Sequence, residues 1–330
     1  MTTALCIFSP AGVVADARSL QRAARRLRGL GFDVRRDPSA AARHQRFAGD
    51  DEARLAALHR VAEAGAAGEL QVALASRGGY GLSRLLDRID WPLIGRSVAA
   101  GLQWVGYSDC TALQLAAIAH GVAVPSSAPH RHGAAGHEPG HHHHHPPAGG
   151  FWAGPMAADD FGRTDEAGGL DDITAPCFEE AVTGQLEAVG FRTEAGFDGL
   201  DLQGRLWGGN LTVLLSLLGT PHWPKVKGGV LFLEDVNEHP YRVERGLLQL
   251  LQAGVLGAQK AVLLGDFDGW RPSPLDRGYN LKAAIAHLRS QTDVPLLTGL
   301  PMGHGPTKVC LPQGRRVTLA VQGREAFIGW

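Results

Sequence analysis

The chain has 330 residues and a mass of 35.0 kDa, and its 32 Lys and Arg residues almost balance its 33 Asp and Glu residues, for a formal net charge of −1. Hydrophobic residues make up 44% of the sequence and charged residues 20%, a composition that suits a large core and argues against wholesale disorder. The near-neutral charge argues against a dedicated nucleic-acid-binding protein, which usually has a basic surplus. The length favours two domains.

The four cysteines, Cys6, Cys110, Cys177 and Cys310, lie far apart in the sequence. This spacing predicts neither a disulfide framework nor a thiolate zinc site. The first residues lack the basic start of a secretion signal, and we interpret residues 5–9 as a buried strand. No run approaches the roughly 18 consecutive apolar residues of a membrane helix. We therefore expect a cytoplasmic protein that binds neither a membrane nor nucleic acid.

In the first half of the chain, short apolar runs alternate with helical patterns. Strands are predicted at residues 5–9, 32–35, 70–75 and 103–107, and helices at 16–30, 53–64, 82–89 and 111–120. This alternation, with strands that are apolar almost throughout, predicts a parallel sheet covered on both faces. The pattern stops at residues 126–150, where Pro, Gly and His dominate and eight of the fifteen histidines lie between positions 130 and 145. We expect a mobile surface loop there.

The second half has a less regular alternation of the same kind. Strands are predicted at residues 202–206, 230–233, 261–264 and 294–297, with further β-like runs through 309 and at 317–321, and helices at 211–218, 243–253 and 281–290. We therefore expect an N-terminal α/β domain over residues 1–165, which includes the His-rich loop 126–150, and a second α/β domain over residues 180–330.

Ligands of parallel α/β sheets bind beyond the carboxyl ends of the strands, and residues 106–110, Gly-Tyr-Ser-Asp-Cys, follow a predicted strand. They resemble a nucleophile elbow, a tight turn that exposes a serine hydroxyl, although Cys110 replaces its second glycine. Alternatively, Ser108 or Asp109 caps the next helix, which the spacing alone favours. Both interpretations hold together if Asp109 caps and Ser108 reacts.

Residues 77–81, Arg-Gly-Gly-Tyr-Gly, also follow a predicted strand. A phosphate-binding loop would need a further glycine where Arg84 stands. The glycines also suit a loop whose backbone amides approach a developing oxyanion. The simplest interpretation is a tight turn with positive φ angles.

A serine nucleophile needs a base and a carboxylate that orients the base. His304 lies in a glycine-flanked loop after a predicted strand, where an imidazole would be accessible, and Glu234 ends another predicted strand. The sequence alone does not rank these residues against their competitors, since Glu234 also suits a surface ion pair with a nearby arginine. The competing carboxylates are Asp235 and Glu238, and the competing histidines are His222, His239 and His287.

The five consecutive histidines at 141–145 are a candidate for binding Ni²⁺ or Zn²⁺. A working metal site needs ligands that are held by rigid elements and supported by a second layer of hydrogen bonds. Adventitious binding or no role is therefore the better interpretation of this run.

Five segments, taken together, resemble the LD-carboxypeptidase (muramoyltetrapeptide carboxypeptidase) family of serine peptidases, which recycle cell-wall peptides in the bacterial cytoplasm. They are RGGYG at 77–81 with RLL at 84–86, VGYSDCTAL at 105–113, GRLWGGNL at 204–211, LFLEDVNEHPYR at 231–242 and PLLTGLPMGH at 295–304. They occur in the order of the family and cover nearly the whole chain.

The resemblance implies a flavodoxin-like or amidotransferase-like N-terminal domain, a distinct C-terminal α/β domain, an active site between them, and a homodimer. It implies that Ser108 is the nucleophile, His304 the base and Glu234 the residue that orients the imidazole. The backbone amides of Gly79 and Asp109 would form the oxyanion hole. No metal or organic cofactor is implied.

The implied substrate is a murein tetrapeptide, from which the enzyme releases the terminal D-alanine. Asn210, Arg242 and Arg245 are candidates for contacts with this substrate. Hydrolysis of peptide–nucleotide antibiotics, as a form of self-immunity, is an alternative within the same family. A non-catalytic protein that binds metal or nucleotide is a further alternative. The His-rich loop is longer than that of relatives, so the substrate range would differ if it shields the cleft.

Overall fold

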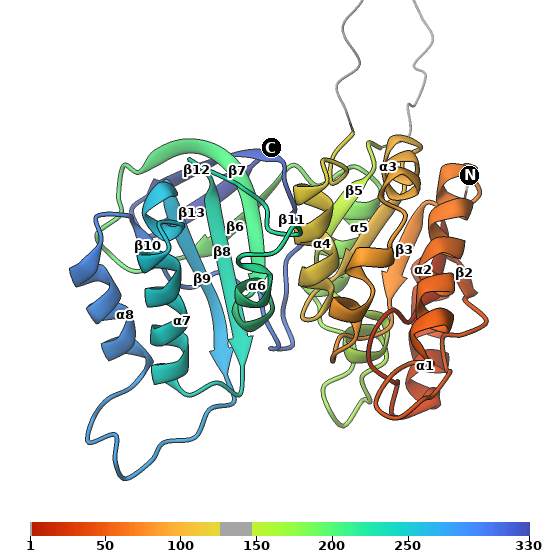
Figure 1. Cartoon of the computed structure of the whole chain (residues 1–330), viewed down its shortest axis with the longest axis horizontal. Helices are drawn as coiled ribbons and strands as arrows, with labels where there is room; N and C mark the ends of the chain where they lie inside the picture. Colours follow the sequence, from red (N-terminus) through yellow and green to blue (C-terminus); the bar gives the residue numbers. More distant parts are fainter. Residues whose placement is uncertain (1, 126–146) are drawn as a thin grey trace, which may run out of the picture.

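The computed structural model describes residues 2–125 and 147–330, which form two β-sheets lying side by side (Figure 1). Most of the predicted His-rich loop, including the run 141–145, lies outside the described residues. Each sheet carries helices packed on it. The chain is thus a mixed α/β protein with a largely parallel N-terminal sheet and a separate C-terminal sheet, as expected.

The first sheet has six strands in the order β11-β5-β4-β3-β1-β2. Their bounds are β1 Ala4–Phe8, β2 Asp33–Arg36, β3 Val72–Ala75, β4 Gln103–Gly106, β5 Gly150–Ala153 and β11 Leu311–Pro312. All neighbouring pairs are parallel except β11 with β5. The helices beside this sheet are α1 Ala17–Gly29, α2 Asp51–Ala66, α3 Trp91–Ala99, α4 Cys110–Ala119 and α5 Thr174–Val182.

Side chains of β1 alternate between two cores, because successive residues of a strand point to opposite faces. Leu5 and Ile7 belong to a core with residues of α1 and α5, whereas Cys6 and Phe8 belong to a core with residues of α2, α3 and α4. This second core continues through Leu214 of the C-terminal half, so one apolar cluster spans both halves.

The second sheet has seven strands in the order β10-β9-β8-β7-β12-β13-β6. Their bounds are β6 Ala188–Arg192, β7 Asp201–Asn210, β8 Val230–Val236, β9 Ala261–Asp268, β10 Leu296–Leu297, β12 Arg316–Gln322 and β13 Glu325–Gly329. Strands β7 to β10 are parallel, and the rest pair antiparallel. The helices are α6 Leu211–Leu217, α7 Pro240–Gln252 and α8 Leu281–Gln291.

The predicted helix at 82–89 is wrong. Residues 82–84 and 86–88 instead form two short 3₁₀ turns. Helix α3, which the sequence did not predict, begins at Trp91. The Asp90 carboxylate accepts the Leu93 N–H at 3.1 Å and caps α3. Pro92 fits the first turn of a helix, where its missing N–H costs nothing. The cap and the proline together fix the start of α3.

Strands β5, β6 and β13 and helix α5 are further elements that the sequence reading did not predict. The boundaries at 165 and 180 remain a prediction. Strand β11 comes from the C-terminal half of the chain yet pairs with Trp152 and Ala153 of the first sheet. Among the residues described, no helix is long and apolar enough to cross a membrane.

Candidate active site

Ser108 lies in the tight turn between β4 and α4 and has a φ of +61°. A positive φ is uncommon outside glycine, and a strained turn of this kind is typical of a nucleophile elbow. A Cβ on Gly106 would lie 2.8 Å from the Cys110 sulfur, so the turn needs glycine at its first position. Cys110 itself is buried beneath the turn. The side chain of Ser108 is half-buried.

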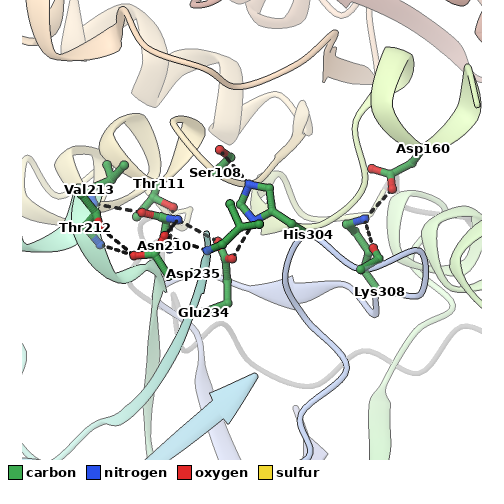
Figure 2. Close-up of polar contacts among 12 residues, drawn as sticks. Ser108, Thr111, Asp160, Asn210, Thr212, Val213, Glu234, Asp235, His304 and Lys308 are labelled. Atoms are coloured by element: carbon green, nitrogen blue, oxygen red, sulfur yellow. Dashed lines mark hydrogen bonds and ion pairs between the residues drawn. The ribbon is translucent and has the colours of Figure 1, made fainter. Parts of the chain in front are cut away.

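His304 lies between Ser108 and Glu234, as Figure 2 shows. Its Nε2 is 3.3 Å from the Ser108 Oγ, and its Nδ1 is 2.9 Å from the Glu234 Oε2. A carboxylate only accepts hydrogen bonds, so the Nδ1–H donates to Glu234 and the Nε2 of the neutral ring is free to accept the serine proton. The three side chains come from the β4–α4 turn, from β8 and from the loop after β10.

Burial and charge act in opposite directions on His304. Desolvation lowers the pKa of its imidazole, but the hydrogen bond and the negative charge of Glu234 outweigh it and raise the pKa above the ordinary value. The Glu234 side chain is only 1% exposed. A buried carboxylate that holds one ring nitrogen favours the tautomer in which the other nitrogen acts as a base.

Only one of the three candidate carboxylates contacts His304. The Asp235 carboxylate accepts the Thr212 N–H at 3.0 Å and the Thr212 hydroxyl at 2.6 Å, so it supports the start of α6. Glu238 pairs with Arg242. Glu234 is therefore the carboxylate that the structure brings to the imidazole.

The competing histidines lie elsewhere. His222 contacts Asp87 and His120, His239 pairs with Asp276 at the start of α7, and His287 is exposed on α8. None of them contacts Ser108 within the described part of the chain.

Asp109 is the N-cap residue of α4, one of the two positions that the sequence offered, but its side chain makes no hydrogen bond to the helix. Its carboxylate instead accepts the Leu82 N–H at 2.9 Å. Desolvation raises the pKa of Asp109 to about 6, against the hydrogen bonds from the Leu82 and Gly81 amides and the charge of Arg54, which lower it. Asp109 thus ties the nucleophile turn to the Gly-rich loop 77–81.

The Gly-rich loop packs directly against the nucleophile. A Cβ on Gly78 would lie 2.7 Å from the Ser108 Cβ and 3.1 Å from the Asp109 nitrogen, so only glycine permits this approach. The Gly78 carbonyl accepts the Gly12 N–H at 2.8 Å. Because the peptide is trans, the N–H of Gly79 points away from Gly12. Across the described residues, neither the Gly79 nor the Asp109 amide donates a backbone hydrogen bond.

The three predicted substrate contacts are not grouped around Ser108. Asn210 is 5% exposed, caps α6 through Val213, and donates from Nδ2 to Glu234 at 3.3 Å and to Asp235 at 3.0 Å. It therefore lies behind Glu234 and helps to position it. Arg242 and Arg245 lie on α7 and line a cavity of about 220 Å³. Their contact with substrate remains a prediction.

A second cavity, of about 430 Å³, adjoins His304 and contains residues that the sequence reading missed. Lys308 is buried in an ion pair with Asp160, and Figure 2 shows the pair beside the His304 loop. The Lys308 ammonium also donates to the Gly305 carbonyl at 2.7 Å, which anchors this loop. The Tyr107 ring meets the His304 ring edge-on, with centroids 5.0 Å apart. No motif joins Asp160 to Lys308, which lie 148 positions apart.

No group of three or more metal-ligating side chains gathers in the part of the chain that the structure describes. The His141–His145 run lies outside it.

The comparisons with known proteins identify the family. Family models of the LD-carboxypeptidase N-terminal domain and C-terminal domain match residues 5–126 and 203–319. The chain belongs to the LD-carboxypeptidase family, as its five motifs indicated, and this is a family of peptidases.

Two curated relatives match over most of their length. The chain is 30% identical to a murein tetrapeptide carboxypeptidase of Pseudomonas aeruginosa, covering 96% of this chain and 92% of that one. It is 28% identical to a probable murein peptide carboxypeptidase of Bacillus subtilis, covering 95% and 88%.

Solved structures have the same fold. A muramoyltetrapeptide carboxypeptidase from Oxalobacter formigenes aligns with a TM-score of 0.81 and 35% identity over 99% of both chains. The microcin C7 self immunity protein MccF, in its wild-type apo state, aligns with a TM-score of 0.80 and 19% identity over 99% of this chain and 96% of that one. The second likeness shows the fold alone.

Proposed function

We propose that the protein is a serine LD-carboxypeptidase that releases the terminal D-alanine of murein tetrapeptides through an acyl-enzyme on Ser108. The observation that carries this proposal is the chain of contacts from the Ser108 hydroxyl through His304 to the buried Glu234. A hydroxyl, a base and an orienting carboxylate in this order are the requirements of nucleophilic acyl transfer. The names of the relatives supply the substrate class.

In the first half-reaction, His304 accepts the hydroxyl proton as the Ser108 oxygen attacks the carbonyl carbon between the diamino acid and D-alanine. Glu234 keeps the ring oriented and stabilises the imidazolium without taking the proton. The oxyanion faces the Gly79 and Asp109 amides, whose N–H groups have no backbone partner. The imidazolium then protonates the departing amine, and the acyl group stays on Ser108.

In the second half-reaction, a water molecule loses its proton to His304 and attacks the acyl-enzyme. Collapse of the second tetrahedral intermediate releases the tripeptide and restores the Ser108 hydroxyl. Asn210 contributes to both half-reactions, because its side-chain amide donates a hydrogen bond to Glu234 and helps to position that carboxylate.

The test is the substitution Ser108→Ala, assayed by the D-alanine released from a murein tetrapeptide. We expect the rate to fall by at least about a thousandfold, and His304→Ala to be comparably damaging, because members of a triad act as a unit. Rapid quenching of the wild-type protein followed by mass spectrometry should find the acyl group on Ser108. Turnover near the wild-type rate in Ser108→Ala would eliminate the assignment.

Two finer parts of the proposal follow from the family resemblance. We expect the protein to act in cell-wall recycling in the cytoplasm and to form a homodimer. Sedimentation velocity at working concentrations tests the dimer, and a monomer there contradicts it.

The alternative within the family is hydrolysis of a peptide–nucleotide antibiotic, which the fold of MccF keeps open. Parallel assays with a murein tetrapeptide and an aminoacyl sulfamoyl nucleotide separate the two activities. A non-catalytic protein would cleave neither and would bind metal or nucleotide stoichiometrically.

A further inference from the structure

Two of the four cysteines, Cys177 and Cys310, contact each other. Cys177 lies on α5, and Cys310 directly precedes β11. The Cys310 N–H donates to the Cys177 sulfur at 3.3 Å. All four cysteines lie in the described residues and have free thiols. The two that contact each other are 133 positions apart, so only the folded chain brings them together.

Helix α5 and the segment that leads into β11 are held together by contacts that involve no sulfur. The Thr174 hydroxyl oxygen accepts the Lys308 N–H at 2.9 Å. The Thr307 hydroxyl donates to the carboxylate of Asp171, just before the helix, at 2.9 Å. The two cysteines continue this row of contacts, three residues after Thr174 on the helix and two residues after Lys308 on the segment. The fold therefore places the two thiols next to each other.

The two thiols differ in exposure and in acidity. Cys177 is half-buried, whereas Cys310 is fully buried. The hydrogen bond from the Cys310 thiol lowers the pKa of Cys177, and the Cys310 amide lowers it further, against desolvation and the charge of Glu180. Desolvation raises the pKa of Cys310, and its hydrogen bond to Cys177 raises it further. Cys177 thus has the thiolate character and the access that oxidation requires, and Cys310 is placed to react next.

The other two cysteines have neither property. Cys6 and Cys110 are buried, and desolvation raises the pKa of both thiols, to about 11 for Cys6. Across residues 2–125 and 147–330, no hydrogen bond joins either of them to another cysteine. Cys6 therefore serves as an internal reference for the reactivity of the pair.

We propose that Cys177 and Cys310 are a site of reversible oxidation, at which hydrogen peroxide converts the two thiols into a disulfide. The Cys177 thiolate attacks one peroxide oxygen, so that an S–O bond forms, the O–O bond breaks and hydroxide leaves. The Cys310 sulfur then displaces hydroxide from the Cys177 sulfenic acid as it loses its proton, and a disulfide forms. Two thiols are oxidised, and one peroxide is reduced to two water molecules.

The disulfide would connect α5 covalently to the segment between His304 and β11. That segment already contains Lys308 in its buried ion pair with Asp160. A cross-link between positions so far apart restricts the unfolded chain, and it should therefore stabilise the oxidised protein.

The test is treatment of the whole protein with hydrogen peroxide, followed by alkylation of the remaining thiols in denaturant and peptide mapping. We expect the number of free thiols to fall from four to two, with the Cys177 peptide joined to the Cys310 peptide. Dithiothreitol should restore all four. The midpoint of urea unfolding should rise by about 1 M in the oxidised form.

Three substitutions separate the roles of the thiols. Cys310→Ser should stop the reaction at the Cys177 sulfenic acid, which dimedone traps. Cys177→Ser should slow the loss of thiols about tenfold or more, because the thiols that remain are buried. Cys6→Ser is the matched control and should form the same disulfide at the wild-type rate.

A protein that loses no thiols to peroxide would overturn the proposal, as would a disulfide that involves Cys6 or Cys110 or that joins two chains. So would conversion of Cys177 to sulfinic acid in the wild-type protein while Cys310 stays free. A lower urea midpoint in the oxidised form would contradict the placement of the two thiols, because it would show that the bond distorts the fold. None of these measurements uses a peptide substrate, so they stand apart from the test of the peptidase activity.

Discussion

The Asp109 carboxylate accepts the backbone N–H of Leu82 at 2.9 Å. This bond joins the residue after the nucleophile to the residue that follows the Gly-rich loop, and both partners are buried. It holds together the two backbone segments that would supply the oxyanion amides.

Asp109→Ala should therefore slow catalysis because the backbone amides of the oxyanion hole lose their positions, and not because a reacting group is removed. The Leu82 N–H loses its partner, which costs about 1–3 kcal/mol of stability. We expect kcat to fall at least about tenfold with a smaller change in KM, because the amides act mainly on the developing oxyanion. Asp109→Asn keeps an acceptor oxygen and should retain most of the activity. Equal losses in the two variants would show that the charge, and not the hydrogen bond, matters.

Glu234→Gln should shift the pH dependence of kcat/KM. His304 is a base only when neutral, so the rate falls as the pH drops below its pKa. Glu234 raises that pKa, and without its charge the desolvation that lowers the pKa remains. We expect the acidic limb of the profile to move to lower pH, while the plateau falls about tenfold or more. Glu238 pairs with Arg242 and not with His304. The control variant Glu238→Gln should therefore leave the acidic limb of the pH profile in place. An acidic limb that stays fixed in Glu234→Gln contradicts the pairing.

Gly78→Ala should lower activity strongly while the protein stays folded. The new methyl group would lie 2.7 Å from the Ser108 Cβ and 2.8 Å from its Oγ, so the hydroxyl or the loop must move. We expect kcat to fall at least about a hundredfold, as for the loss of an oxyanion donor. Gly29→Ala is the control, because nothing lies within 4 Å of the added carbon. Activity of Gly78→Ala within a few-fold of wild type would contradict the close approach.

Lys308→Met should lower the free energy of unfolding, measured in urea, by about 3–5 kcal/mol, because it leaves Asp160 buried and unpaired. The double variant with Asp160→Asn should recover part of this loss, since it removes the charge and keeps an acceptor for the Met156 N–H. Lys225→Met, at an exposed position, should change stability by less than about 0.5 kcal/mol. A Lys308→Met protein as stable as wild type would show that the pair is not needed for folding.

The strands and helices with strong local patterns could be predicted from the sequence, and most of them are confirmed. Strand β5 could not, because only four residues, Gly150–Ala153, follow a segment without any periodicity. Strands β6 and β13 are short and pair mainly with each other and with β12, so their assignment depends on partners that are distant in sequence. The 3₁₀ turns at 82–88 depend on Asp109, which comes 27 positions later than Leu82.

The candidate triad could be named from motifs, but its choice among competing residues came from the family resemblance and not from spacing. From the sequence alone, Glu234, Asp235 and Glu238 were equally good candidates for the carboxylate that orients the imidazole. What separates them is tertiary contact, since Asp235 is engaged by Thr212 and Glu238 by Arg242. Asp160 and Lys308 gave no signal at all, because their ion pair joins segments from the two halves of the chain.

Strand β11 has a mechanical consequence for the triad. The loop that carries His304 begins at β10, which pairs with β9 in the C-terminal sheet. It ends at β11, which pairs with β5 in the N-terminal sheet. His304 therefore lies on a loop that is attached to both sheets. Ser108 belongs to the N-terminal sheet alone, and Glu234 to the C-terminal sheet alone. Any hinge motion between the sheets would pull on this loop and alter the 3.3 Å between His304 and Ser108. Cleavage of the chain between β10 and β11 would break this connection between the sheets. A fragment that ends before β11 would leave β5 as an unpaired edge strand of the N-terminal sheet.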